Sequence, residues 1–218
     1  MHTYILSLGS NIAPRLQYLR FGLCLLSRRG EMLACSSAYE TSPVGMRADD
    51  GPFLNCAIRY SSCILDPRAL LRYIKEIEER AGRDLTERYK PRPLDIDIIV
   101  WSGGEWRDEY LVIPHPRAHE RLFVIAPYAE ICAGPGVPAG DAGDAGDAGA
   151  QKLEERSESQ FFCSSDAGST QNAERSEAEQ GLWDAARNYA EQGGAQDQKI
   201  EFFCGSDVLC ANPEEITL

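Results

Sequence analysis

Two acidic residues open an otherwise apolar segment of the chain. The segment LDIDIIV, residues 94–100, is predicted to be a β-strand because branched apolar residues dominate it. Side chains alternate along a strand, so Asp95 and Asp97 should point to one face, with Cβ atoms about 7 Å apart. Two carboxylates that close repel each other unless a cation lies between them. Mg²⁺ is the natural cation here, because it prefers oxygen ligands and fills its remaining positions with water or phosphate oxygens.

Basic residues flank this acidic pair on both sides. A D-x-D pattern alone is more often a solvated strand face or a set of structural ion pairs with nearby arginines. Arginines beside a carboxylate pair are also what a complex of Mg²⁺ with a polyphosphate requires, because metal and arginines together neutralise the phosphate oxygens. By themselves, the residues indicate magnesium and phosphate binding and nothing narrower. The flanking basic residues are Arg83, Arg88, Lys90 and Arg92 upstream, and His115, Arg117, His119 and Arg121 downstream.

The composition indicates a domain of ordinary size followed by a segment of different character. The chain has 218 residues, 43% of them hydrophobic, which is enough for a core. Residues 141–218 carry 17 of the 34 acidic residues and 5 of the 22 basic ones, so the net charge of −12 belongs to this part. No run approaches the ~18 apolar residues of a membrane span. The beginning of the chain lacks a basic region and a cleavage site, so we expect a cytoplasmic location.

The elements that position the acidic pair follow from hydrophobic periodicity. Strands are predicted at residues 3–10, 31–41 and 52–62, and helices at 14–29 and from Asp66–Pro67 to Gly82, where Asp66 is the expected N-cap. With the strand at 94–100, the order is β-α-β-β-α-β. The fold class we expect is therefore α+β, a ferredoxin-like antiparallel sheet with helices packed against it.

The remainder of the chain is predicted to divide into two parts. Residues 133–180 contain AGDAGDAGDAGA, which offers too little apolar surface to offset the entropy of ordering, so we expect an acidic, disordered insertion. Residues 181–192 have the pattern of an amphipathic helix. The predicted organisation is a domain at 1–132, the insertion at 133–180, and a helix and tail at 181–218 that pack back on the domain.

Five segments of the chain form an ordered set of motifs. They are LSLGSN, YETSPVG, PFLNCAI, GRDLTERYKPRPLDIDIIVWSG and IPHPRAHERLFVIAPYAEI. In order and spacing they resemble the first strand, the pterin loop, the second-substrate strand, the signature around the acidic strand and the segment after it in the 6-hydroxymethyl-7,8-dihydropterin pyrophosphokinase family. The resemblance covers residues 4 to about 132.

The resemblance implies a folate-biosynthesis enzyme that transfers pyrophosphate from ATP to the hydroxymethyl oxygen of the dihydropterin and releases AMP. It implies that Asp95 and Asp97 hold two Mg²⁺ ions and that Arg83 and Arg92 act with them in catalysis. The residues that it implies for nucleotide binding are Glu78, Arg83, Arg88, Arg92, Ile98, His115 and Arg121.

The resemblance also implies a pterin pocket in which two aromatic rings sandwich the heterocycle. Taken one at a time, a phenylalanine is more often a core residue and an asparagine more often serves the backbone, so the assignment depends on their joint match to the family pattern. The residues implied are Thr41, Pro43, Val44, Phe53, Asn55 and Phe123.

This chain departs from the family signature in one loop. The stretch between Gly82 and Arg88 is one residue shorter than in the signature, and Asp84–Leu85 stands where a second arginine is expected. Tyr89 replaces a tryptophan and Lys90 a glycine. We expect these changes to affect loop closure and rate more than reaction type.

The expected partners are ATP and hydroxymethyldihydropterin, with no nucleic acid and no membrane, and the expected state is a monomer. Two alternatives remain open on the residues alone. A different Mg²⁺-dependent nucleotidyl transferase with a ferredoxin-like palm would release pyrophosphate in place of AMP. A non-catalytic ferredoxin-like binding module would show no Mg²⁺-dependent binding of ATP.

Overall fold

The computed structural model of the chain describes residues 1–42, 51–84, 90–133, 181–182, 184–188, 200–204 and 209. The predicted insertion lies outside these ranges apart from its first residue, so its expected disorder stays a prediction. Four residues of interest, Pro43, Val44, Arg88 and Tyr89, also lie outside them.

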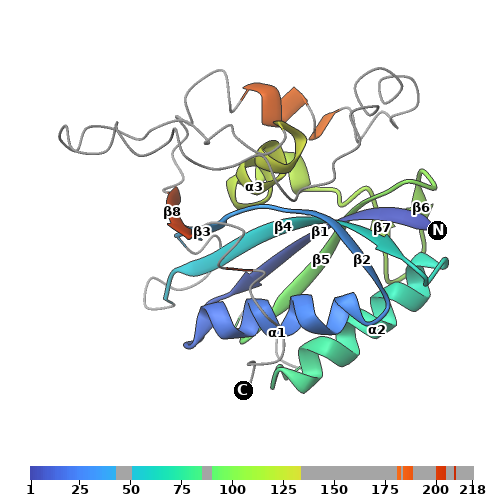
Figure 1. Cartoon of the computed structure of the whole chain (residues 1–218). Helices are drawn as coiled ribbons and strands as arrows, with labels where there is room; N and C mark the ends of the chain where they lie inside the picture. Colours follow the sequence, from blue (N-terminus) through green and yellow to red (C-terminus); the bar gives the residue numbers. More distant parts are fainter. Residues whose placement is uncertain are drawn as a thin grey trace, which may run out of the picture.

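An antiparallel sheet forms the centre of the molecule (Figure 1). Its order is β5-β1-β4-β3-β8, and β2 pairs with β4 beside β3. All five pairings are antiparallel. The α+β class with an antiparallel sheet and helices is therefore confirmed. The strands of this sheet are β1 (His2–Ser10), β2 (Gly30–Cys35), β3 (Ala38–Thr41), β4 (Phe53–Ser62), β5 (Asp95–Trp101) and β8 (Ile200–Cys204).

The single strand predicted at residues 31–41 is in fact two strands. β2 pairs with the second half of β4 and β3 with its first half. Between them, the Ser36 hydroxyl accepts a hydrogen bond from Ala57 N at 2.9 Å. Ser37 donates from both N and Oγ to the carboxylate of Glu130, at 2.9 and 2.8 Å. The regular strand is interrupted here, where Ser36 keeps one backbone bond to Ala57 O at 2.9 Å and the two serines add side-chain bonds to β4 and to Glu130.

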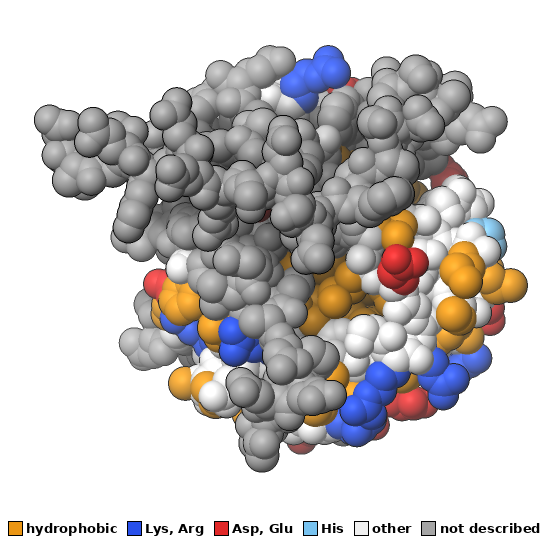
Figure 2. All heavy atoms as spheres, viewed as in Figure 1, with side chains coloured by type: hydrophobic (Ala, Val, Ile, Leu, Met, Phe, Trp, Pro, Cys, Tyr) orange, Lys and Arg blue, Asp and Glu red, His pale blue; other side chains and the backbone are white. Residues whose placement is uncertain are grey.

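Helices cover both faces of the sheet (Figure 1). On one face lie α1 (Arg15–Ser27) and α2 (Pro67–Arg80), and on the other lies α3 (Leu122–Ala133). Asp66 caps α2 as predicted, since its carboxylate accepts a hydrogen bond from Arg68 N at 2.9 Å. In Figure 2, Lys and Arg side chains gather along the rim formed by α1 and α2. No helix in the described ranges has the length and apolarity needed to cross a membrane.

The two faces of the sheet have separate cores. Leu6, Leu8, Ile96 and Ile98 belong to the core beneath α1 and α2. The core beneath α3 includes Ile5, Ala57, Ile99 and Val100. Asp95 and Asp97 alternate with Ile96 and Ile98, so both carboxylates lie on the α3 face, as the strand pattern predicts.

Short elements complete the domain between β5 and α3. β6 (Trp106–Arg107) and β7 (Val112–Ile113) form a separate hairpin, and the 3₁₀ helix η1 (Ala118–Glu120) follows. Later in the chain, residues 181–182 and 184–188 are helical, and Leu182 and Ala186 are buried in the core beneath α3. Strand β8 follows and pairs with β3, an element that the sequence analysis does not predict.

Candidate active site

Three neighbouring strands place predicted metal and pterin residues in one row across the sheet. This row, Asn55–Gly9–Asp95, is called the rung below. Gly9 of β1 pairs with Asp95 of β5 on one side and with Asn55 of β4 on the other. Adjacent strands lie about 4.8 Å apart, so Asn55 and Asp95 are separated by roughly 10 Å across the rung. Ser7, two residues earlier, pairs with Asp97. The predicted sites for the two substrates are therefore next to each other on the α3 face.

Glycine at position 9 is required by this arrangement. A Cβ atom at Gly9 would lie 2.8 Å from Asn55 Oδ1 and 3.6 Å from Phe53 Cδ1. A side chain at position 9 would therefore displace the Asn55 amide oxygen, whereas its Cβ atom would be in ordinary van der Waals contact with the Phe53 ring.

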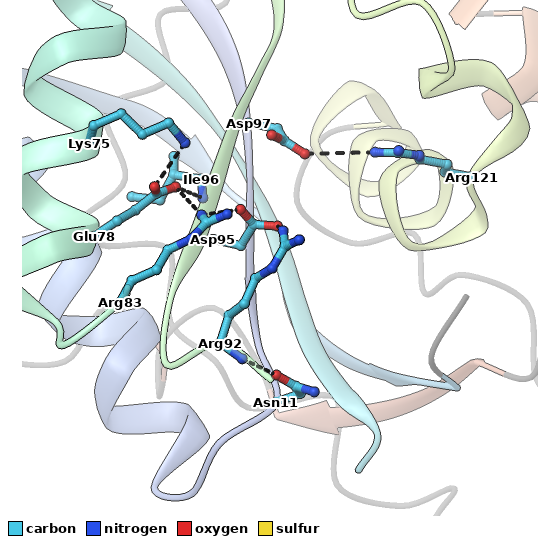
Figure 3. A network of polar contacts seen from close by, with 9 residues as sticks. All are labelled: Asn11, Lys75, Glu78, Arg83, Arg92, Asp95, Ile96, Asp97 and Arg121. Atoms are coloured by element: carbon cyan, nitrogen blue, oxygen red, sulfur yellow. Dashed lines mark hydrogen bonds and ion pairs between the residues drawn. The ribbon is translucent and has the colours of Figure 1, made fainter. Parts of the chain in front are cut away.

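Asp95 lies between two arginines (Figure 3). Arg83 Nη1 donates to Asp95 Oδ1, and Arg92 Nη1 donates to Asp95 Oδ2 at 2.6 Å. Burial alone would raise the pKa of Asp95, but the charges of Arg83 and Arg92 outweigh it and the pKa is lowered. Asp95 is therefore ionised at neutral pH and is already neutralised by cations of the chain.

Asp97 has far less cationic support. Among the described residues it forms an ion pair with Arg121, whose Nη1 lies 3.7 Å from Asp97 Oδ2 (Figure 3). Burial, followed by the charge of Asp95, raises the pKa of Asp97 to about 6. The second carboxylate therefore carries negative charge that the protein itself does not balance, as expected of a group that receives a metal ion.

Glu78 belongs to α2 and contacts both strand β5 and Arg83. Its side chain is fully buried, and its Oε1 accepts a hydrogen bond from Ile96 N at 2.8 Å and forms an ion pair with Arg83 Nη1 at 2.8 Å. Its Oε2 accepts from Lys75 Nζ at 2.8 Å (Figure 3). Burial raises the pKa of Glu78, and the charges of Lys75 and Arg83 oppose that shift.

The position of Glu78 indicates a role different from direct nucleotide contact. Strand β5 is at the edge of the sheet, so Ile96 N–H has no strand partner on its outer side. Glu78 supplies the missing acceptor and also orients Arg83 towards Asp95. We therefore interpret Glu78 as a positioning residue for β5 and Arg83.

Asn11 is a functional candidate that the sequence reasoning missed. Its Oδ1 accepts from Arg92 N at 2.6 Å, and its own N donates to Arg92 O at 3.1 Å. This pair of bonds joins the turn after β1 to the basic loop before β5. The only sign in the sequence was its place in the Gly-Ser-Asn turn. An asparagine in a turn usually bonds to the backbone of that turn, so this position did not by itself indicate a role in the site.

The remaining predicted nucleotide residues that the structure describes, Ile98, His115 and Arg121, lie on or next to β5 and α3. His115 N donates to Ile99 O at 2.9 Å, and its Nδ1 accepts from Arg117 N at 3.3 Å. Burial, then the charges of Arg121 and Arg117, lower the pKa of His115 to about 4. The ring is therefore neutral at pH 7, with Nε2 as its hydrogen-bond donor.

Ile98 can contribute only its backbone to a ligand. Its side chain is buried in the core beneath α1 and α2, away from the face that carries Asp97. Alternate residues of an edge strand direct their N–H groups the same way, so Ile98 N–H faces outward like Ile96 N–H. If Ile98 contacts a nucleotide as predicted, it does so through its backbone N–H and not through its side chain.

At the predicted pterin site, the hydrogen-bonding side chains of β3 and β4 are neutral. Asn55 and Thr41 are buried, and Asn55 Nδ2 donates to Thr41 Oγ1 at 2.8 Å. Phe53 pairs with Thr41 across the strands. Phe123 packs against the core beneath α3, and Arg121 lies over its ring at 5.5 Å.

Within the described ranges the structure brings together most of the predicted site. Arg88, Pro43 and Val44 lie outside these ranges. Three or more metal-binding side chains do not cluster anywhere in the part of the chain that is described. A metal ion would therefore have two carboxylates from the chain and take its other ligands from water or substrate. The residues placed on or beside the rung are Thr41, Phe53, Asn55, Arg83, Arg92, Asp95, Asp97 and Arg121.

Comparison with known proteins identifies the family of this chain. Residues 5–133 match the family model described as 7,8-dihydro-6-hydroxymethylpterin-pyrophosphokinase (HPPK). A 2-amino-4-hydroxy-6-hydroxymethyldihydropteridine pyrophosphokinase of Bacillus subtilis is 43% identical over 129 residues, covering 58% of this chain and 76% of the relative. A protein of the same description from Aquifex aeolicus is 34% identical over 131 residues, covering 60% and 81%.

A third relative carries the similarity within a longer chain. The bifunctional protein FolKE of Lactococcus lactis subsp. cremoris is 39% identical over 134 residues, which cover 60% of this chain and 38% of the relative. The match to the family model covers more than half of the present chain and contains the whole rung. The chain therefore belongs to the 7,8-dihydro-6-hydroxymethylpterin-pyrophosphokinase family.

Proposed function

We propose that this chain transfers pyrophosphate from ATP to 6-hydroxymethyl-7,8-dihydropterin in folate biosynthesis, giving AMP and the dihydropterin pyrophosphate. The observation that carries the proposal is the rung Asn55–Gly9–Asp95, which sets a neutral hydrogen-bonding group beside a carboxylate pair with no side chain between them. Such a surface suits a flat heterocycle on one side and a metal-bound polyphosphate on the other.

The carboxylate pair fits magnesium. Asp95 and Asp97 share one face of β5, and burial together with the neighbouring charge of Asp95 raises the pKa of Asp97, so a cation at this position would favour its ionised form. Both residues would hold Mg²⁺, for which we propose two ions. When bound, the ions would neutralise phosphate oxygens and favour attack at phosphorus.

Arg83 and Arg92 would bind the phosphates. Both now neutralise Asp95, and Arg92 Nε is buried without a hydrogen-bond partner among the described residues. An unpartnered buried donor is costly, and a phosphate oxygen would satisfy it. Binding of metal to Asp95 would make both arginines available to phosphate oxygens. Arg88, Ile98, His115 and Arg121 would complete the nucleotide site, with Glu78 holding Arg83 in place.

The pterin would lie on the α3 face beside Asn55. Asn55 and Thr41 would supply hydrogen bonds at its edge, with the loop residues Pro43 and Val44. Phe53 and Phe123 would contact its two faces, since both rings belong to the α3 side of the sheet.

The reaction that these residues would serve is an in-line displacement. The hydroxymethyl oxygen attacks the β-phosphorus of ATP, the bond from that phosphorus to the AMP oxygen breaks, and AMP leaves. The hydroxyl proton passes to solvent or to a nearby carboxylate. The protein's contribution is to hold the two substrates and to place positive charge around the phosphates.

One assay tests the proposal. The chain is incubated with ATP, Mg²⁺ and 6-hydroxymethyl-7,8-dihydropterin, and AMP is measured with and without the pterin and the metal. AMP formation that needs both supports the proposal. Release of pyrophosphate would indicate a nucleotidyl transferase, and absence of Mg²⁺-dependent ATP binding would indicate a binding module.

A further inference from the structure

Arg15, the first residue of α1, contacts three separate segments of the chain. Its Nη1 donates to Pro52 O at 2.9 Å, and its Nη2 lies 2.6 Å from Glu40 Oε2. Its guanidinium carbon also lies 5.9 Å from the centre of the Phe203 ring. One side chain thus joins β3, the residue before β4, and β8.

These three segments surround the pterin side of the site. Pro52 directly precedes Phe53, and Glu40 directly precedes Thr41. Thr41 and Phe53 pair across the strands, and Thr41 also binds the amide of Asn55 at 2.8 Å. A shift of β3 relative to the start of β4 would therefore separate the groups proposed to contact the pterin.

Strand β8 supports the same edge from outside. Its register places Ile200 opposite Thr41 and Glu201 opposite Glu40. Without β8, β3 would be the open edge of the sheet at this point. Phe203 is 46% exposed, so its ring is not held by the core. The contact with Arg15 links this ring, and with it β8, to α1.

The chemistry of arginine suits this position. A guanidinium group has five donors in a rigid plane, so it can bind a carbonyl and a carboxylate together and present its face to a ring. A lysine at the same position would keep the charge near Glu40 but not all three contacts. Arg15 and Glu40 are only 23% and 30% exposed, so this ion pair should count for more than an exposed surface pair.

We propose that Arg15 is a positioning residue for the pterin side of the site, and that it acts by fixing β3, the start of β4 and β8 together. The proposal rests on the proposed function, because it assigns Arg15 to one of the two substrates of that reaction. It predicts a selective effect: pterin binding depends on Arg15, whereas ATP binding on the far side of the rung does not.

The test compares Arg15→Ala, Arg15→Lys and the unchanged chain. We expect Arg15→Ala to raise the KM for the pterin about tenfold, with the KM for ATP changed less than about twofold and kcat less than about threefold. Arg15→Lys should restore part of the loss. Titration of the pterin in the presence of Mg²⁺ and a non-hydrolysable ATP analogue should show the same rise in Kd.

Two further variants make the test specific. Arg28→Ala removes an exposed arginine from the other end of the same helix and should leave both KM values unchanged. Phe203→Ala removes only the ring contact and should raise the pterin KM about threefold. The melting temperature of each variant is measured as well. A general loss of stability would affect the KM values of both substrates, so it would not explain a rise in the KM for the pterin alone.

The possible results separate this inference from the proposed function. If the unchanged chain forms AMP and Arg15→Ala leaves the pterin KM unchanged, or raises both KM values equally, the role of Arg15 is wrong and the function stands. If the unchanged chain forms no AMP and binds no pterin, the proposed function fails and this inference fails with it.

Discussion

The two sides of the rung are constructed from different interactions. On the nucleotide side, Asp95 is held by Arg83 and Arg92, and buried Glu78 supports Arg83. On the pterin side, Asn55 and Thr41 form a buried neutral hydrogen bond. A neutral pair can be complete before substrate arrives, whereas the charged side contains Asp97, whose charge the chain leaves largely unbalanced. We therefore expect the proposed pterin side to be preformed and the proposed nucleotide side to be completed by its ligands.

The largest effect should come from removing the carboxylates. Asp95→Ala and Asp97→Ala should each lower AMP formation by at least about a thousandfold, because each removes a proposed metal ligand. The change is measured as kcat with saturating ATP and Mg²⁺, and circular dichroism should show that the fold is retained. Substantial activity in both variants would show that the pair does not hold the metal.

The second-largest effect should come from removing the charge of the buried Glu78, and it should be seen in the free energy of unfolding. Glu78→Gln should reduce the free energy of unfolding by about 3 kcal/mol, because it leaves the cations Lys75 and Arg83 without their buried partner. Chemical denaturation measures the loss. Glu79→Gln changes the neighbouring exposed acid and is the control. Equal stability of the two variants would contradict the supporting role of Glu78.

A smaller and selective effect is expected on the neutral side. Asn55→Ala should raise the KM for the pterin about tenfold, because it removes the buried amide and leaves the Thr41 hydroxyl without that partner. The KM for ATP should change little, and steady-state kinetics with each substrate varied in turn gives both values. A matching rise in the KM for ATP would mean that the two sides are not independent.

The smallest effect is the difference in stability between variants of the two carboxylates, measured in protein without metal. Asp97→Asn should raise stability and Asp95→Asn should lower it, because Asp97 is ionised at a cost whereas Asp95 neutralises two arginines. Since the Asp97 side chain is 36% exposed, the gain should be below about 1 kcal/mol. Melting temperatures without Mg²⁺ measure both changes.

The pH dependence of that contrast follows from the sign of the shift. The pKa of Asp97 is raised from 3.8 to about 6, so the folded chain holds the proton more tightly than the unfolded one. Stability of the unchanged protein therefore falls, relative to Asp97→Asn, as pH rises from about 4 to about 6. The difference should vanish below pH 4 and become constant above about pH 7. A difference that does not vary with pH would contradict the assignment of the shift to Asp97.

Periodicity was sufficient to predict most of the fold that holds the site. Strands β1, β4 and β5 and helices α1 and α2 lie within a few residues of their predicted positions. The break between β2 and β3 was not predictable, because it depends on Ser36 and Ser37 finding partners in β4 and α3. Strand β8 was missed for a similar reason: its pairing partner, β3, lies about 160 residues earlier.

The candidate site was predicted unevenly. Asp95 and Asp97 were placed on one face by strand alternation and were singled out through the flanking basic residues and the resemblance to the family, and the pterin residues came from the resemblance alone. Glu78 was assigned to the nucleotide, whereas the structure places it in the interior, bonded to Ile96 N and Arg83. Asn11 and Arg15 were not singled out, because their contacts are to residues distant in the sequence.

The amino-acid sequence is enough to place two carboxylates on one face of a strand, because alternation is a local property of the backbone. It is also enough to identify the family, through five ordered segments. The folded structure is needed to see that Asn55, Gly9 and Asp95 form one rung and that Asp95 is neutralised while Asp97 is not. Strand register and electrostatic balance depend on which distant segments meet, and packing of the two cores determines that.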